Sequence, residues 1–150
     1  MARNYYVNGS CTAGTNKTAV ELVTATTVRA KIYEIMVGCS AAPASQAAAW
    51  HLQRHTGTSG GSTTTQTPAL LDPADPVSLL AAKVNLSAEA TYTAGQVVWE
   101  LALNQQATFD WKANPGREFT LAASATAGAG LKTSTSTGTA VHQGSLYWEE

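Results

Sequence analysis

Charged residues are scarce in this sequence. Asp, Glu, Lys and Arg make up 13% of its 150 residues, against about 25% in a typical soluble domain. The formal net charge is −1, so no strong field draws the chain to nucleic acid or to an anionic membrane surface. Small uncharged residues, mainly Thr, Ala, Ser and Gly, stand where charges would be. Such a surface suits contact with neighbouring proteins, and we expect no nucleic-acid or membrane partner.

A membrane-spanning run and a cysteine framework are also missing. The sequence has no run of about 18 apolar residues, and its first residues lack the apolar core of a secretory signal peptide. The two cysteines, Cys11 and Cys39, belong to no CxxC motif and to no Cys/His cluster in the sequence. We therefore expect a protein made and assembled in a reducing cytoplasm, with both thiols free.

Catalytic and cofactor motifs are absent as well. The sequence contains no G-x-S-x-G elbow, no P-loop and no dinucleotide fingerprint. Asp110 and Glu118 could be interpreted as the two catalytic carboxylates of a glycosidase. Both, however, occupy the polar faces of predicted strands, and acidic side chains are ordinary at such solvent-facing positions. We expect no enzyme, no catalytic residue and no cofactor.

Two residue pairs have spacings that raise the question of a metal. His51 and His55 are four residues apart, as zinc ligands are on a helix, but in a strand this separation is about 13 Å. We expect two surface histidines instead. Asp72 and Asp75 could contribute to a calcium site, but the alternating donors and closing Glu of an EF-hand loop are missing. Turn formation and helix capping explain both aspartates, and we expect no metal site.

Alternation of apolar and polar residues with a period of two is the dominant pattern, and it predicts strands with one buried face. It is clearest around Trp50, Trp99, Trp111 and Trp148, which all fall on the apolar phase. We expect these four side chains to be largely buried. Eight or nine strands of this kind can be counted. They predict an all-β fold, a jelly-roll-like antiparallel β-sandwich of about eight strands with at most one short helix.

The segment 28–37 breaks this alternation, because Glu34 falls on the face that Val28 and Ile32 make apolar. A β-bulge would shift the register by one residue and reconcile the two halves. Alternatively, the second half of the segment is covered on both faces.

Turn-forming residues separate the predicted strands. Asn8-Gly9, residues 114–116 and residues 128–130 supply glycine or proline where the chain could reverse. The longest irregular region runs from Thr56 to Pro76, and loops of that length are usually functional or disordered. At its end, Asp75 as N-cap and Pro76 as the first helical residue predict a short helix through Ala82.

Several segments follow one another in an order that resembles the small head decoration, or cement, proteins of tailed bacteriophages. The most distinctive are a Gly/Ser/Thr-rich loop, a following Pro and Leu-Asp-Pro, and a closing strand that ends in an acidic pair. The resemblance covers most of the chain from Val28 onward, and it rests on residues 31–38, 52–54, 56–63, 67–75, 104–106, 111–116 and 147–150.

The resemblance implies a jelly-roll-like sandwich, often a homotrimer, bound to the major capsid protein on the outside of the phage head. Assembly would take place in the host cytoplasm, and no catalytic residue is carried over. Residues 28–150 would form the decoration domain, with residues 1–27 as an N-terminal arm or its first strands. The arm and the long loop supply the expected partner interface, which comprises Tyr5, Tyr6, Thr58, Thr63, Pro68, Leu70, Leu71, Asp72 and Asp75.

A carbohydrate- or receptor-binding module of a phage fibre is the alternative, because the same sandwich architecture serves lectins. A site of that kind requires solvent-facing Trp or Tyr beside Asn, Asp or Gln. The apolar phase of the tryptophans counts against it. A hydrolase is the least favoured class, because no catalytic constellation is found. The fold alone does not distinguish between these three classes.

Overall fold

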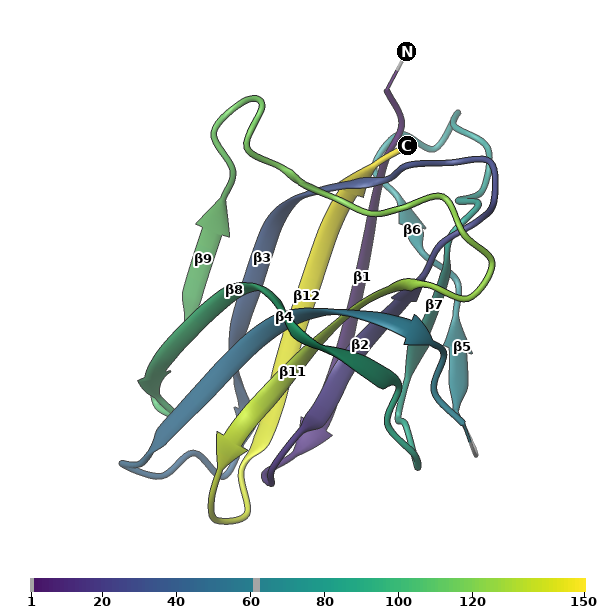
Figure 1. Ribbon diagram of the computed structural model, residues 1–150. Helices are drawn as coiled ribbons and strands as arrows, with labels where there is room; N and C mark the ends of the chain where they lie inside the picture. The colour runs from purple at the N-terminus through teal and green to yellow at the C-terminus, as the bar shows by residue number, and fades with distance from the viewer. Residues whose placement is uncertain (1, 61–62) are drawn as a thin grey trace.

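The chain folds as two antiparallel sheets packed face to face, as Figure 1 shows. The structure, a computed structural model, describes residues 2–60 and 63–150, and these contain no helix; residues 61–62 of the predicted long loop lie outside this range. None of the described residues belongs to a helix that could cross a membrane. The strands are β1 (Asn4–Thr12), β2 (Lys17–Val23), β3 (Lys31–Ala41), β4 (Ala47–Gly57), β5 (Thr64–Gln66), β6 (Ala69–Leu70), β7 (Ala81–Val84), β8 (Thr91–Asn104), β9 (Phe109–Lys112), β10 (Phe119–Thr120), β11 (Gly128–Ser136) and β12 (Val141–Glu149).

The strand order is that of a jelly roll. One sheet, sheet A, has the order β10-β3-β12-β1-β6, and β9 pairs with the same strand β3 as β10 does. The other, sheet B, has the order β5-β7-β2-β11-β4-β8. If β9 and β10 are counted as one interrupted strand, β1-β12-β3-β9 and β2-β11-β4-β8 form an eight-stranded frame, which confirms the predicted fold class.

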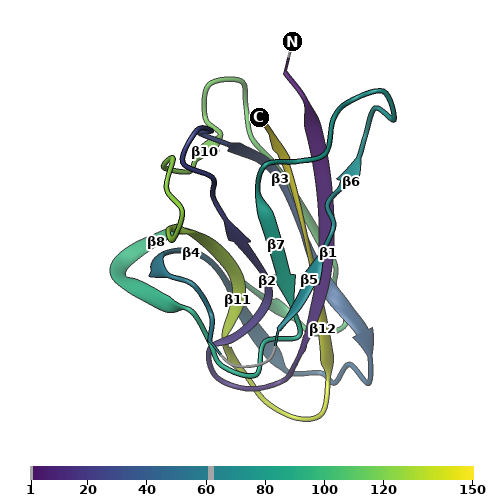
Figure 2. The ribbon, with the colours of Figure 1, turned by 90° about the vertical axis from the view of Figure 1, so that its right-hand side faces the viewer.

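The chain between β4 and β8 adds strands to one side of this frame. β6 pairs with β1 in sheet A, while β7 pairs with β2 in sheet B, and Figure 2 shows β5, β6 and β7 together on that side. On this side of the frame, the edge strands β1 and β2 therefore each have a short additional strand beside them, and short edge strands offer fewer free backbone groups to another chain. Residues 4–23 supply two strands of the frame, so this part of the chain is not a free arm.

The core lies between the sheets and is built around two of the four tryptophans. Trp50 and Trp148 are fully buried, as the alternation predicted. Trp99 and Trp111 are only partly buried and pack against the margin of the core. The prediction is wrong for these two because they lie on the outermost strands β8 and β9, which have a neighbouring strand on one side only.

A β-bulge in β3 resolves the irregular segment around Glu34. The register between β3 and β12 shifts between Tyr147 and Trp148, so Tyr33 is the extra residue. Ile32 and Ile35 both face the core, and Tyr33 and Glu34 both lie toward the outside. The predicted bulge is confirmed. The alternative of cover on both faces is wrong, because Met36 is 41% exposed.

Two of the predicted turns are parts of strands. Asn8-Gly9 lies inside β1 and pairs with β12, and residues 128–130 begin β11. At Gly128 a β-carbon would collide with the carbonyl oxygen of Leu22, so glycine serves close strand packing there and not chain reversal. The turn predicted at residues 114–116 is present. Gly116 has a φ of 82°, and Arg117 N donates to Asn114 O over 2.9 Å.

The short helix predicted from Asp75 to Ala82 does not form. Ala81–Val84 is strand β7, which pairs with β2 through Glu21 and Lys83. Asp72 stabilises a turn before it, accepting from Ala74 N at 2.9 Å through its side chain. The local preference of Asp75-Pro76 for a helix start is overridden because the residues that follow pair with a neighbouring sheet edge.

Candidate functional site

The structure separates the expected interface residues into buried and accessible ones. Tyr5 is fully buried, and its hydroxyl donates to Pro76 O over 3.0 Å. Pro68 is buried as well, so neither side chain can contact a partner in this fold, and both are removed from the expected interface. Leu71 and Asp72 are exposed, and the side chains that are half-buried are those of Tyr6, Thr58, Thr63, Leu70 and Asp75.

Three tyrosines and a methionine gather on the outer face of sheet A, and we call Tyr6, Tyr33, Met36 and Tyr147 the tyrosine face. Tyr6 pairs with Tyr147 across β1 and β12, and their ring centroids are 4.6 Å apart. The bulge places Tyr33 on the other side of Tyr147, with centroids 6.4 Å apart. Burial raises the pKa of Tyr33 and of Tyr147, so these hydroxyls are uncharged at neutral pH.

The tyrosine face has an uncharged centre and a charged rim. A hollow of about 360 Å³ reaches from the centre to the rim, and its lining includes Tyr6, Met36, Tyr147 and Gln143 as well as Asp110 of the rim. At the rim, Lys112 Nζ lies 3.3 Å from Asp110 and 3.6 Å from Glu34. A rim of paired charges around an aromatic centre is typical of protein interfaces.

The loop of residues 71–79, which we call the apolar loop, extends this surface. Leu71, Val77 and Leu79 are 51%, 67% and 53% exposed, and Leu71 lines a hollow of about 480 Å³ together with Tyr33. The C-terminal residue Glu150 holds the loop in place. Its carboxylate accepts from Leu79 N over 3.0 Å and from Trp148 Nε1 over 3.1 Å.

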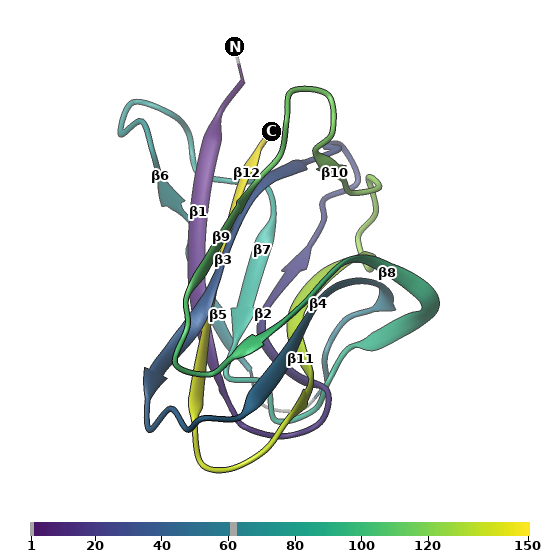
Figure 3. The ribbon, with the colours of Figure 1, turned by 90° about the vertical axis from the view of Figure 1, so that its left-hand side faces the viewer.

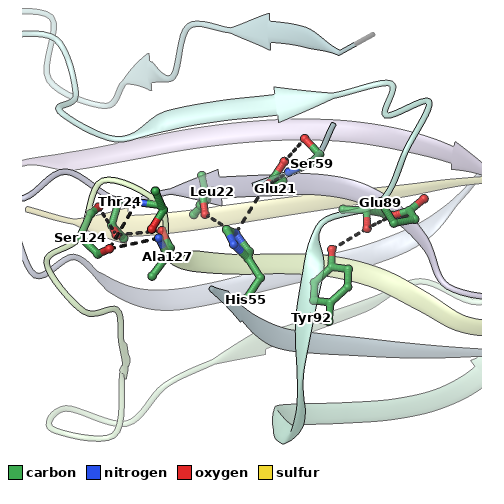
Figure 4. Close-up of polar contacts among 11 residues, drawn as sticks. Glu21, Leu22, Thr24, His55, Ser59, Glu89, Tyr92, Ser124 and Ala127 are labelled. Atoms are coloured by element: carbon green, nitrogen blue, oxygen red, sulfur yellow. Dashed lines mark hydrogen bonds and ion pairs between the residues drawn. The ribbon is translucent and has the colours of Figure 1, made fainter. Parts of the chain in front are cut away.

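A buried polar cluster lies on sheet B, and Figure 4 shows its members converging. His55 Nε2 lies 3.5 Å from a Glu21 carboxylate oxygen and 3.2 Å from Leu22 O. Both side chains are almost completely buried, and Tyr92 of β8 packs edge-on against His55. The expectation of a surface histidine is therefore wrong for His55. Burial lowers its pKa in spite of the neighbouring Glu21.

This cluster contains a serine, a histidine and an acid, but not in a catalytic order. Ser59 donates both its N–H, over 2.9 Å, and its hydroxyl to Glu21. A nucleophilic serine would instead have to donate to the histidine. The contacts of Glu21 fasten the chain after β4 to strand β2, and we assign them to the stability of the fold.

The neighbouring contacts fasten the start of β8 in the same way. The Glu89 carboxylate accepts from Thr18 N over 3.2 Å and also from the Thr18 hydroxyl, which lies 2.6 Å from the hydroxyl of Tyr92. Lys132 Nζ lies 4.2 Å from the centre of the Tyr92 ring, a cation–π contact. These residues tie the curved first half of β8 (Figure 3) to β2 through Thr18 and to β11 through Lys132.

Cys39 contacts a histidine that sequence spacing could not reveal. Its Sγ lies 3.2 Å from His142 Nδ1, although 103 positions separate the two residues. His142 Nε2 is 2.5 Å from Ser136 Oγ. Burial raises the pKa of the Cys39 thiol and lowers that of His142, so burial favours the neutral form of both groups. Both Cys39 and Cys11 are free thiols.

The remaining candidate residues are spread over the surface. His51 Nε2 lies 3.3 Å from Glu100, and Glu118 accepts from Gly116 N over 2.9 Å, a bond that lowers the pKa of its carboxyl. Within the described ranges, no three His, Cys, Asp or Glu side chains lie close enough together to hold a metal ion. No family model, no curated protein and no solved structure matches the chain. The tyrosine face and the apolar loop together have the geometry of a protein-binding surface.

Proposed function

We propose that the protein is a structural decoration, or cement, protein that binds the outer surface of an assembled tailed-phage head. The observation that carries the proposal is the tyrosine face, where three tyrosines and the exposed Met36 lie side by side on one sheet. Tyr and Met are among the residue types enriched at protein interfaces. The sequence resemblance to decoration proteins supplies the class of partner, the major capsid protein.

The composition of this surface fits attachment to a protein lattice. The apolar loop adds Leu71, Val77 and Leu79 beside the tyrosine face, and an area of about 800 Å² per partner is enough for a specific interface. Since the charges at the rim already pair with one another, binding should rest on apolar contacts. We therefore expect binding to depend only weakly on salt.

A protein that binds the assembled shell and not its free subunits stabilises the shell by mass action. In this proposal homotrimers sit at the junctions between capsomers, and each copy presents its tyrosine face to the capsid protein. Neither catalysis nor a cofactor is involved.

The direct experiment mixes the purified protein with heads that lack it and sediments the heads in low and in high salt. We expect the protein to travel with the heads in both buffers and the loaded heads to resist heating better than bare ones. Heads that sediment bare in both buffers, or that are no more heat-resistant when loaded, would overturn the proposal.

Binding of a glycan on the same surface is the second candidate. Tyr6 and Tyr147 are half-buried and line the hollow that also contains Gln143 and Asp110. Accessible aromatic rings beside amide and carboxylate groups are the arrangement that a saccharide-binding site requires. A glycan array with clear hits that disappear in Tyr147→Ala, together with no binding to heads, would favour this candidate.

A further inference from the structure

Another hollow lies apart from the tyrosine face, and we call it the arginine pocket. It has a volume of about 420 Å³ and shares no lining residue with the tyrosine face. Its polar lining includes Arg29, Arg54, Thr93, Gln96 and Thr120. Most of the residues that line it belong to β4, to β8, to β10 and to the connection that follows β10, and Figure 3 shows this connection running down toward β8. Its size falls in the range of small-molecule sites.

Both arginines of the pocket are free of acidic partners. No Asp or Glu lines the pocket, and in the described part of the chain no carboxylate lies within 4.0 Å of Arg29 or Arg54. Arg54 Nη2 donates to Thr120 O over 3.0 Å, which orients the guanidinium and leaves its other N–H donors available. A guanidinium with a fixed plane binds carboxylates in a bidentate manner.

The rest of the lining consists of uncharged polar groups and an apolar wall. In the described residues, no hydrogen bond uses the hydroxyl of Thr93 or of Thr120, or the side-chain amide of Gln96. Leu121, Ala122 and Ala127 add an apolar wall. Free hydroxyls and an amide can bind the hydroxyl groups of a ligand, while the wall can cover the carbon face of a ring.

We propose that the arginine pocket binds a hydroxylated carboxylate of the size of a sugar acid. The carboxylate lies between the guanidinium groups of Arg54 and Arg29, and the ring hydroxyls contact Thr93, Thr120 and Gln96. This activity is separate from shell binding, since it uses neither the tyrosine face nor the apolar loop.

The test is a calorimetric titration of the purified protein with D-glucuronate, D-glucose and inorganic phosphate. We expect saturable binding of glucuronate at concentrations up to about 10 mM, and at least tenfold weaker binding of glucose, which has the same ring without the carboxylate. Absence of glucuronate binding, or glucose binding of equal strength, would overturn the proposal. If inorganic phosphate bound as tightly as glucuronate, the assignment of a hydroxylated ring as part of the ligand would be overturned.

Variants locate the binding within the molecule. Arg54→Gln and Arg29→Gln should each weaken glucuronate binding at least tenfold, while the control Arg117→Gln should leave it unchanged. Arg29 lies in an exposed connection, so its variant should fold normally even if Arg54→Gln is unstable. Unchanged binding in a correctly folded Arg29→Gln would place the ligand elsewhere and contradict the proposal. Failure of the shell experiment would not affect this result, because the two surfaces share no residue.

Discussion

The ring of Tyr5 stacks on the ring of Trp148, with centroids 5.8 Å apart and planes inclined by 29°. The first strand of the frame, β1, and the last, β12, are joined at this contact between two fully buried rings. Tyr5 therefore serves the fold, while its neighbour Tyr6 faces outward and serves the surface. Adjacent residues in a strand divide the two tasks in this way because successive side chains point to opposite faces.

Truncation of Trp148 should be far more damaging than truncation of Trp111. Trp148→Ala removes a fully buried ring, and we expect a loss of about 3–5 kcal/mol in the free energy of unfolding. Trp111 is only partly buried and stacks on Phe119 at the margin of the core, so Trp111→Ala should cost clearly less. Urea unfolding of the two variants tests this. Equal losses would mean that β9 belongs to the central core.

Gly128→Ala should destabilise the fold although it adds a single methyl group. The new β-carbon would collide with Leu22 O and with the His55 ring, so β11 and β2 would have to separate. Overpacking of this kind costs about 1–3 kcal/mol. Gly60→Ala is the matched control, because its new β-carbon would have no heavy atom within 4 Å beyond its chain neighbours. Similar thermal unfolding of the two variants would contradict the close packing of β11 against β2.

The stability of the protein should fall as the pH drops below about 6.5. Burial lowers the pKa of His55, which faces Glu21 and Lys83, and of His142. The unfolded chain therefore binds protons on these rings at a higher pH than the folded chain does. Above the unfolded pKa, both rings are neutral in both states and contribute no pH dependence. Each unit of difference between folded and unfolded pKa corresponds to about 1.4 kcal/mol.

Urea unfolding between about pH 8 and pH 5 measures this dependence. His142→Asn should reduce the change in the free energy of unfolding between these two pH values, because one of the two buried rings is removed. A free energy of unfolding that rises as the pH falls through this interval would contradict the assigned direction for both histidines.

The fold class and much of the core could be predicted from local patterns. Alternation placed Trp50, Leu52, Leu146 and Trp148 in the core, since a period of two fixes which face of a strand is apolar. The break at Glu34 correctly indicated a bulge. These features depend on residues close together in the sequence, which is why the sequence reveals them.

Features that depend on pairing between distant segments could not be predicted. The Asp75-Pro76 capping signal indicated a helix, but β7 forms because the edge of β2 is available to it. His55 has the pattern of a surface residue but is buried, and Tyr92, which packs against it, lies 37 positions further along the chain. The contact between Cys39 and His142 spans 103 positions. The tyrosine face likewise joins β1, β3 and β12, and no local pattern indicates that its three tyrosines meet.

The most direct test of the proposed function compares two substitutions on opposite sheets. Met36 on the tyrosine face is 41% exposed, and Val97 on sheet B is 36% exposed, so a lysine should be tolerated by the fold at either position. The measurement is the affinity of Met36→Lys and Val97→Lys for heads that lack the protein. We predict that Met36→Lys weakens binding at least about tenfold, a loss of about 1.4 kcal/mol, while Val97→Lys binds like the unmodified protein. Equal binding by the two variants, or a loss confined to Val97→Lys, would contradict attachment through the tyrosine face.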